Sequence, residues 1–256
     1  MINKITKPSS SLLESFILPW SVYPYANYIK YGFDSRIFSI YELNGKIITK
    51  YDDSLQLCFN EINDAEYLEV FKFAKRNNVR MISGKQEIIR KFATFFENSK
   101  AYYGYIFEND CILDVKDSNK IMYASSKQQF EEIAKLVCDC NSDNKSYYTI
   151  TQYFNQIYSR FTLKYCRNWI CTQDAKTIGH IATYAETDKF AVIGGLAVQT
   201  NYRKQGIGKN LLCFANNELI KEGKIIYWFC YNPNLQDFYH SISSKCYPCG
   251  KLLLQK

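Results

Sequence analysis

Apolar residues in the second half of the chain recur at spacings that alternate between strands and helices. Ser126 and Gln129 have the spacing of a capping box, and the apolar residues of 130–137 fall on one helical face. Aromatic residues at every third or fourth position of 153–161 predict a second helix. The remaining expected elements are strands over 121–124, 168–171, 177–184, 190–198 and 225–230, a helix over 210–222, and a closing hairpin of 244–247 with 251–255 around Pro248.

The first half of the chain predicts a similar order of elements. Asn44-Gly45 between two apolar runs is a strong hairpin signal. The elements expected after this hairpin are a strand over 55–59, a helix over 64–76, a strand over 79–82, a helix capped by Ser83, and strands over 102–107 and 112–115. This is the order of the second half without its first strand and helices. We therefore expect the first half to be a degenerate tandem copy of the second.

Composition places the chain among globular proteins. It has 256 residues, of which 47% are hydrophobic and 16% aromatic, with only 11 glycines and 5 prolines. These values exclude a disordered or collagen-like chain. No apolar run approaches the ~18 residues of a membrane helix, and no secretory signal is evident, so we expect a cytoplasmic protein without a membrane partner.

Ten cysteines are spaced irregularly, which in a chain of this length favours reduced thiols. Cys138-x-Cys140 and Cys246-Tyr-Pro-Cys249 have the spacing of zinc ligands, but the second also reads as a turn with Pro second and Gly fourth. We expect no metal site.

The net charge of +7 is concentrated in the second half. Residues 126–256 hold 16 lysines and arginines against 10 acidic residues, whereas residues 1–125 hold 16 against 15. An anionic ligand is therefore expected on the second half. No run of basic residues and no stripe of basic and aromatic residues accompanies the charge, so we do not expect nucleic acid as the partner.

Two glycine-containing segments of the second half predict a place where a ligand approaches the backbone. Gly194-Gly195 inside the strand over 190–198 indicates a bulge or a close approach. The segment Arg203-Lys204-Gln205-Gly206-Ile207-Gly208-Lys209 then opens a helix. Because the first N–H groups of a helix lack partners within it, such a loop is suited to a phosphate or diphosphate.

Two common phosphate loops do not fit this segment. A nucleoside-triphosphate loop needs Gly where the chain has Arg203, and Ser or Thr where it has Asn210. A dinucleotide loop needs a small residue where the chain has Leu211, and no acidic residue ends the next strand.

The remaining pattern, Arg-x-x-Gly-x-Gly, resembles the acetyl-CoA pyrophosphate loop of the GNAT superfamily of N-acyltransferases, and the element order of residues 120–256 is that of the GNAT fold. A second segment, from Asn232 to Tyr239, resembles the family's Asn that precedes a short helix and the Tyr seven residues later. The chain departs from the family at Ser243 and Ser244, where Gly and an aromatic residue are expected.

The resemblance implies an α+β protein of tandem GNAT-like domains, each with a mixed, mostly antiparallel sheet flanked by helices. The expected domains are 1–118, without a cofactor loop, and 119–256, which binds acetyl-CoA. The first copy has Asn60-Glu61-Ile62-Asn63-Asp64 in place of the loop, with two carboxylates where phosphate oxygens would lie. One functional site, in the second domain, is therefore expected.

By the same resemblance, acetyl-CoA contacts the loop over 203–209, the backbone of Leu196, Ala197 and Val198, and Asn232. A backbone N–H of that strand polarises the thioester carbonyl, and Tyr239 is the general acid; a buried tyrosine that anchors the helix is the alternative. Glu186 and Asp188 are the nearest carboxylates in sequence to the cofactor strand, and we take Glu186 as the candidate base, with a solvated turn carboxylate as the alternative.

Three functions follow from these residues. The first is N-acetyl transfer from acetyl-CoA to a primary amine of a small molecule or peptide, by direct attack. The second is a non-catalytic acyl-CoA-binding or regulatory protein. The third, an aminoacyl transferase that uses a charged tRNA, is disfavoured by the glycine loop.

Overall fold

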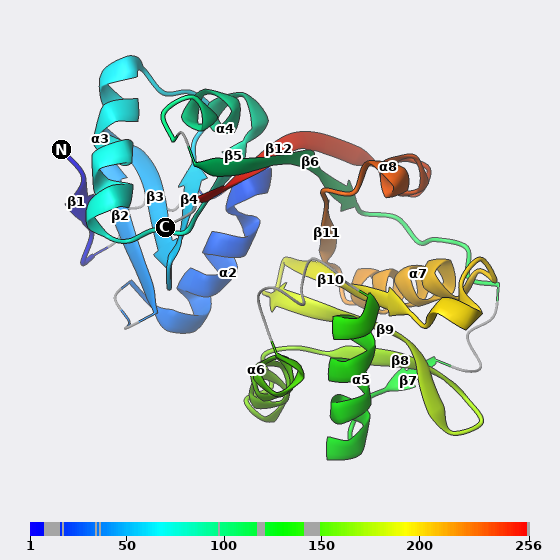
Figure 1. Ribbon diagram of the computed structural model, residues 1–256. Coiled ribbons are helices and arrows are strands. Elements are labelled where there is room, and N and C mark those ends of the chain that lie inside the picture. The colour runs from blue at the N-terminus through cyan, green and yellow to red at the C-terminus, as the bar shows by residue number, and fades with distance from the viewer. Residues whose placement is uncertain are drawn as a thin grey trace. The chain divides into compact units, whose positions relative to one another are not determined.

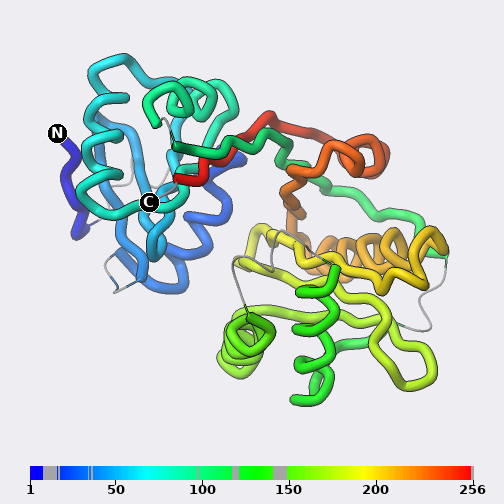
Figure 2. The backbone as a smooth tube through the Cα atoms, in the orientation of Figure 1, coloured from blue at the N-terminus to red at the C-terminus, as the bar shows by residue number. Residues whose placement is uncertain are grey.

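The computed structural model describes residues 1–7, 16, 18–33, 35, 37–96, 98–116, 121–140 and 149–254. The chain divides into two compact units (Figure 1). The first contains Met1–Phe107 and Phe229–Lys256, and the second contains Glu108–Trp228. Figure 2 follows the chain as its red C-terminal segment returns to the unit that the blue and cyan segments begin.

The first unit is a mixed sheet with helices on both faces. Its strands lie in the order β1-β2-β3-β4-β5-β12-β6. They are β1 (Asn3–Lys4), β2 (Phe38–Leu43), β3 (Lys46–Tyr51), β4 (Ser54–Cys58), β5 (Met81–Lys85), β6 (Ser99–Asn109) and β12 (Lys245–Leu254). Its helices are the short η2 (Pro19–Ser21), α2 (Val22–Tyr31), α3 (Asp64–Arg76), α4 (Gln86–Ala93) and α8 (Pro233–His240).

Successive side chains along the strands of the first unit point to opposite faces of the sheet, and both faces carry an apolar layer. Ile48 packs with buried residues of α3 and α4, whereas its neighbour Ile47 packs on the opposite face with tyrosines of α2. The hairpin of β2 and β3 turns at Asn44 and Gly45, both with positive φ, as the sequence predicts.

The second unit has the strand order β11-β10-β9-β8-β7. Its elements are β7 (Ile121–Tyr123), α5 (Lys127–Cys140), α6 (Ile150–Thr162), β8 (Asn168–Gln173), β9 (Lys176–Glu186), β10 (Phe190–Val198), η4 (Thr200–Tyr202), α7 (Ile207–Ile220) and β11 (Ile225–Cys230). Helices α5 and α6 pack on one face of this sheet around Phe130, and α7 covers the other face (Figure 1). Gly179 shows how close α7 lies, because a Cβ there would be 2.7 Å from Leu211 Cδ1.

These elements confirm the α+β class and the mixed, mostly antiparallel sheets expected from the sequence. Each unit also contains the same parallel crossover: β4, α3 and β5 in the first, and β10, α7 and β11 in the second. The capping box of Ser126 and Gln129 is confirmed by reciprocal hydrogen bonds of 3.2 and 3.0 Å.

Four local predictions were wrong. The segment 245–254 is one continuous strand rather than a hairpin. Its register with β5 begins at Cys249, directly after Pro248, so the missing N–H of Pro248 removes no hydrogen bond from that ladder. Helix α7 begins at Ile207 rather than at 210. Ser83 lies within β5, so it caps no helix, and residues 112–115 form no strand. The predicted loop over 141–145 and the boundary at 118/119 lie outside the described residues.

The pairing of β12 with β5 gives compact units that differ from the proposed sequence domains. The last strand belongs to the first unit, although 119–256 was proposed as one domain. A terminal strand can be exchanged between two copies of a fold without changing which copy encoded it. The division at 118/119 therefore stays a proposal about the sequence copies.

A cluster of ion pairs in the second unit connects the end of β9 with the segment that follows α7. Arg167 donates to Glu186 at the end of β9, with Nη2 2.6 Å from Oε1, and also pairs with Glu222 after α7. Lys224 Nζ lies 2.7 Å from Glu186 and 2.8 Å from Glu222. The hydrogen bond from Arg167 lowers the pKa of Glu222 from its ordinary 4.5 to about 2.

We predict a pH-dependent contribution of Glu222 to stability. Because its folded-state pKa is lowered, the contribution is complete above about pH 4.5 and is lost as the pH falls toward 2. The Glu222→Gln variant lacks it, so urea unfolding should show the largest loss relative to wild type above pH 4.5 and a vanishing loss near pH 2. Glu131→Gln, from an exposed pair at 3.9 Å, is the control. Parallel stability curves for wild type and Glu222→Gln would contradict the cluster's role.

Candidate functional site

Strand β10 parts from its parallel neighbour β11 after its first three residues. The register with β11 comprises only Phe190 with Ile225, Ala191 with Ile226 and Val192 with Tyr227. Residues 193–198 continue the strand with no register partner in β11, and on the other side they pair with β9. Backbone N–H and C=O groups that face away from β9 are therefore open to an extended ligand.

A bulge in β10 lies within this unpaired stretch. The register with β9 shifts between Gly194 and Ala197, and Gly195 has a φ of 67°. A Cβ on Gly194 would lie 2.8 Å from the Tyr184 ring, and a Cβ on Gly195 would lie 2.7 Å from the Tyr184 hydroxyl. The bulge that the sequence predicts is confirmed, and both glycines are needed because Tyr184 lies against the backbone.

The segment after β10 ends with a glycine at the start of α7. Gly206 is the N-cap residue, with a φ of 83° and no side-chain hydrogen bond to the helix. The bond from Asn210 N to Gly206 O follows it, so the N–H groups of residues 207–209 precede the first helical hydrogen bonds. These groups and the helix dipole form a site suited to an anion.

Basic side chains surround this helix start. Arg203, Lys204 and Lys209 are exposed, and Arg203 Nε donates to the Val198 carbonyl at 3.0 Å, which ties the loop to the end of β10. Lys204 has a φ of 61° and so turns the backbone before Gly206. The unpaired stretch of β10, residues 193–198, which we call the open strand, and the positively charged start of α7 are therefore close together in the sequence.

The equivalent helix start in the first unit is already filled. Asn63 caps α3 by accepting from Glu66 N, and Glu66 Oε2 accepts from Asn63 N, both at 3.0 Å. The other oxygen of Glu66 accepts from Asn44 and Lys46, and the Glu66 side chain is buried. The Glu66 carboxylate thus occupies the position that an anionic ligand would need.

Strands β4 and β5 of the first unit share three registered pairs, as β10 and β11 do, but they remain in contact beyond the last pair, Gln56 with Ser83. Beyond the registered pairs of β4 and β5, a Cβ on Gly84 would lie 3.2 Å from the Leu57 carbonyl. Ser83 Oγ donates to the side chain of Gln56 and to the Leu55 carbonyl. Both features of the second unit's site are therefore closed in the first.

Asn232 and Tyr239 lie on α8, which the first unit contains. Asn232 is the N-cap residue and accepts from Asn234 N at 3.0 Å. Tyr239 is buried against Phe107, with ring centroids 5.6 Å apart. Burial raises the pKa of the Tyr239 hydroxyl well above its usual value, so the hydroxyl keeps its proton at neutral pH.

Glu186 lies in the ion-pair cluster rather than alone on a turn. Its Oε1 accepts from Arg167 and Lys224, and its Oε2 accepts from Arg167 Nε at 3.1 Å. This engagement weighs against direct proton abstraction by Glu186, because three charge-assisted hydrogen bonds already occupy its oxygens.

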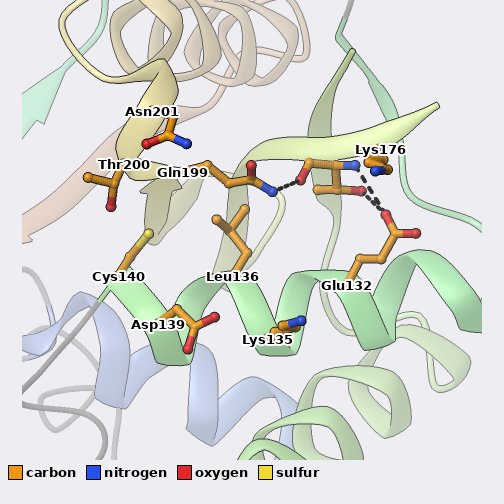
Figure 3. Close-up of a pocket in the computed structure, with 10 residues that line it drawn as sticks. Glu132, Lys135, Leu136, Asp139, Cys140, Lys176, Gln199, Thr200 and Asn201 are labelled. Atoms are coloured by element: carbon orange, nitrogen blue, oxygen red, sulfur yellow. Dashed lines mark hydrogen bonds between the residues drawn. The ribbon is translucent and has the colours of Figure 1, made fainter. Parts of the chain in front are cut away.

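A pocket of about 540 Å³ that the sequence did not predict lies in the second unit. Figure 3 shows α5 side chains on one side of it and Gln199, Thr200 and Asn201 on the other. Glu132 accepts from the Thr177 hydroxyl at 2.6 Å. Two lysines and two carboxylates line the pocket, so its charge selects no particular ion.

The cysteines and histidines suggest no metal site in the part of the chain that the structure describes. All ten cysteines are free thiols. Among the described residues, no three His, Cys, Asp or Glu side chains are grouped as metal ligands. Within the same residues, none of the helices has the length and hydropathy required to cross a bilayer.

Comparisons with known proteins agree with this geometry. A family model, acetyltransferase (GNAT) family, matches residues 130–242, which include the open strand and the loop. A search of curated protein sequences finds no significant match.

Solved structures with the same fold span nearly the whole chain. A tandem GNAT protein from the clavulanic acid biosynthesis pathway is 8% identical, with a TM-score of 0.54, and the match covers 98% of this chain and 97% of that one. A GCN5-related N-acetyltransferase from Kribbella flavida is 11% identical, with a TM-score of 0.60 and coverage of 92% and 96%. A GNAT-family acetyltransferase from Colwellia psychrerythraea is 13% identical, with a TM-score of 0.56 and coverage of 99% of each chain.

The similarity to these structures shows the fold. Residues 130–242, which run from the unit that contains β10 through α8, match the GNAT acetyltransferase family model, and the chain as a whole has a tandem GNAT-like fold.

Proposed function

We propose that this protein is an N-acetyltransferase, which moves an acetyl group from acetyl-CoA to a primary amine of a small molecule or peptide. The observation that carries the proposal is the uncapped start of α7 directly after a strand that has parted from its neighbour. GNAT enzymes in general transfer acyl groups from acyl-CoA. The choice of acetyl and of an amine is part of the proposal.

The loop would hold the diphosphate of the cofactor. Backbone N–H groups of residues 206–209 would donate to its oxygens, and Arg203, Lys204 and Lys209 would add positive charge. Gln205 lies on the same loop, with its side chain bonded to the Asn201 carbonyl. A Cβ on Gly206 would meet nothing within 4 Å, and one on Gly208 would make only ordinary contacts, so the protein itself leaves room beside the loop.

The pantetheine arm would extend the sheet beside β10. Leu196, Ala197 and Val198 lie in the stretch without a register partner in β11, so their outward backbone groups would pair with the amides of the arm. By the family resemblance, Asn232 would contact the same arm. One N–H of β10 would polarise the thioester carbonyl, an effect typically of about 3 kcal/mol in the transition state.

The reaction would proceed by direct attack without a covalent enzyme intermediate. The amine nitrogen forms a bond to the thioester carbon, the carbon–sulfur bond breaks, and the departing thiolate takes the proton of the Tyr239 hydroxyl. An amine with a pKa near 10.4 is neutral in only about one molecule in 2,500 at pH 7, so loss of its proton must be assisted. We assign that step to a water molecule that passes the proton to Glu186, the carboxylate at the end of β9, rather than to direct contact, because the Glu186 oxygens already accept from Arg167 and Lys224.

The location of the protein belongs to the same proposal. Ten free thiols suit a reducing compartment, and acetyl-CoA is a soluble co-substrate, so we propose that the protein acts in the cytoplasm. The principal alternative is a protein that binds acyl-CoA without catalysis.

A glycine exchange tests the loop. We predict that Gly206→Glu weakens acetyl-CoA binding at least 100-fold in a calorimetric titration, because a carboxylate at the start of α7 repels the diphosphate and fills its place. Gly223→Glu is the matched control: Gly223 also has a positive φ, 79° against 83°, and also has open space around its Cβ, but it follows the other end of α7. Equal affinity for the two variants would contradict the site.

A substitution at Tyr239 distinguishes an acetyltransferase from a protein that binds acyl-CoA without catalysis. We predict that Tyr239→Phe lowers kcat for thiol release from acetyl-CoA by about 100-fold across responsive amines, while cofactor affinity stays within about 3-fold, because only the leaving thiolate loses its acid. Tyr231→Phe removes a second buried hydroxyl, which contacts Cys249, and should leave kcat unchanged. Cofactor binding without any thiol release by the wild-type protein would instead support the non-catalytic alternative.

A further inference from the structure

His180 of β9 is a buried polar residue whose two ring nitrogens both have partners. Its side chain is fully buried. Nδ1 lies 2.9 Å from the Gly195 carbonyl oxygen in the bulge of β10, and Nε2 lies 3.0 Å from the side-chain oxygen Oδ1 of Asn168 on β8. The His180 side chain therefore links its own strand, β9, to both neighbouring strands through hydrogen bonds, which is more than packing alone requires.

The direction of the hydrogen bond to Gly195 follows from the chemistry of its partners. Burial lowers the pKa of His180 to about 4, so the ring is neutral at physiological pH. A carbonyl oxygen only accepts, so Nδ1 carries the hydrogen and donates it to Gly195. Nε2 then carries no hydrogen, which requires the Asn168 amide to be turned so that Nδ2 meets Nε2 and Oδ1 takes the place beside the Cys166 thiol, 3.3 Å away.

The bond to Gly195 fixes the orientation of one peptide group. The peptide that joins Gly195 to Leu196 is trans, so its C=O and N–H point in opposite directions. Its carbonyl is held toward His180 on β9. The Leu196 N–H therefore points away from the His180 ring, in the stretch of β10 that has no register partner in β11.

The packing around Gly195 restricts the orientation of the peptide between Gly195 and Leu196. A Cβ on Gly195 would lie 3.3 Å from His180 Cε1 and 2.7 Å from the Tyr184 hydroxyl. Both side chains come from β9, four residues apart, and they contact the bulge from the same face of the sheet. A hydrogen bond accepted by the carbonyl also polarises its peptide and strengthens the N–H at the other end as a donor.

We propose that His180 is a positioning residue for acyl transfer, which aims and polarises the Leu196 N–H as the donor to the thioester carbonyl oxygen by holding the Gly195 carbonyl. The inference rests on the proposed function for its catalytic consequence, whereas the orientation of the peptide is a property of the protein alone. His180 touches neither cofactor nor acceptor in this role.

Two closely related variants separate the two ring nitrogens. His180→Asn places an amide N–H near the position of Nδ1 and keeps the donor to Gly195. His180→Gln places its amide near Nε2, so it keeps the contact with Asn168 and loses the donor to Gly195. Thr183→Val is a control on the same strand, because Thr183 is equally buried and its hydroxyl accepts from Arg167 N at 2.8 Å, away from the bulge.

The experiment measures acetyl transfer to a responsive amine and the ¹⁵N resonance of Leu196, which reports hydrogen bonding at the carbonyl of the same peptide. We expect His180→Gln to lower kcat by 10- to 100-fold with KM for acetyl-CoA changed less than about 3-fold, and to shift the Leu196 resonance. We expect His180→Asn and Thr183→Val to stay within about 3-fold of wild type in kcat and to leave that resonance near its original position.

The outcomes distinguish the two proposals. Equal losses of kcat in His180→Gln and His180→Asn, or an unmoved Leu196 resonance in His180→Gln, would overturn the positioning role. Absence of acetyl transfer by the wild-type protein would overturn the proposed function. In that case, a shifted resonance in His180→Gln alone would still support the orientation of the peptide, and an unmoved one would overturn it.

Discussion

Backbone N–H groups at the start of a helix need partners from outside the helix, and the two copies of this fold meet that need in different ways. In α3, the side chains of Asn63 and Glu66 supply the partners, and the Glu66 carboxylate provides the negative charge that the helix dipole favours. In α7, Gly206 supplies no side chain at all. The same secondary structure is thus complete in one copy and suited to an external anion in the other.

The same contrast extends to the neighbouring strands. In the first unit, β4 and β5 stay together beyond their last registered pair, Gln56 with Ser83, because Gly84 lies against Leu57. In the second unit, the bulge at Gly194 and Gly195 shifts β10 against β9 as β10 leaves β11. An extended ligand needs both an open backbone edge and a charge site at the end of that edge. Only the second unit offers the two together among the described residues.

The sequence predicts the features that depend on local chemistry. Asn44-Gly45 and the capping box of Ser126 specify their turn and helix start through neighbouring residues alone, and the paired glycines of β10 predict the bulge. The prediction of a turn at Pro248 was wrong because a strand also accepts proline at a position where a neighbouring strand does not need its N–H, which local sequence does not reveal. The opening beside β10 depends on where its pairing with the later strand β11 stops, and this is a property of the sheet.

Side-chain contacts between residues that are distant in the sequence were the hardest features to predict. Nothing near His180 in the sequence indicates that its ring meets the carbonyl of Gly195, fifteen residues later, since that contact requires the register of β9 with β10. Glu186 was chosen for its nearness in sequence to the cofactor strand. Its engagement by Arg167 and Lys224 depends on residues 19 positions before it and 38 after it.

We propose that one helix start, that of α7, holds the diphosphate of the cofactor. A crystal structure of the protein with coenzyme A would test this. We expect diphosphate density against the N–H groups of residues 206–209, pantetheine density beside residues 196–198, and no ligand at Asn63. Diphosphate density at the start of α3, or coenzyme A bound away from β10 and α7, would contradict it.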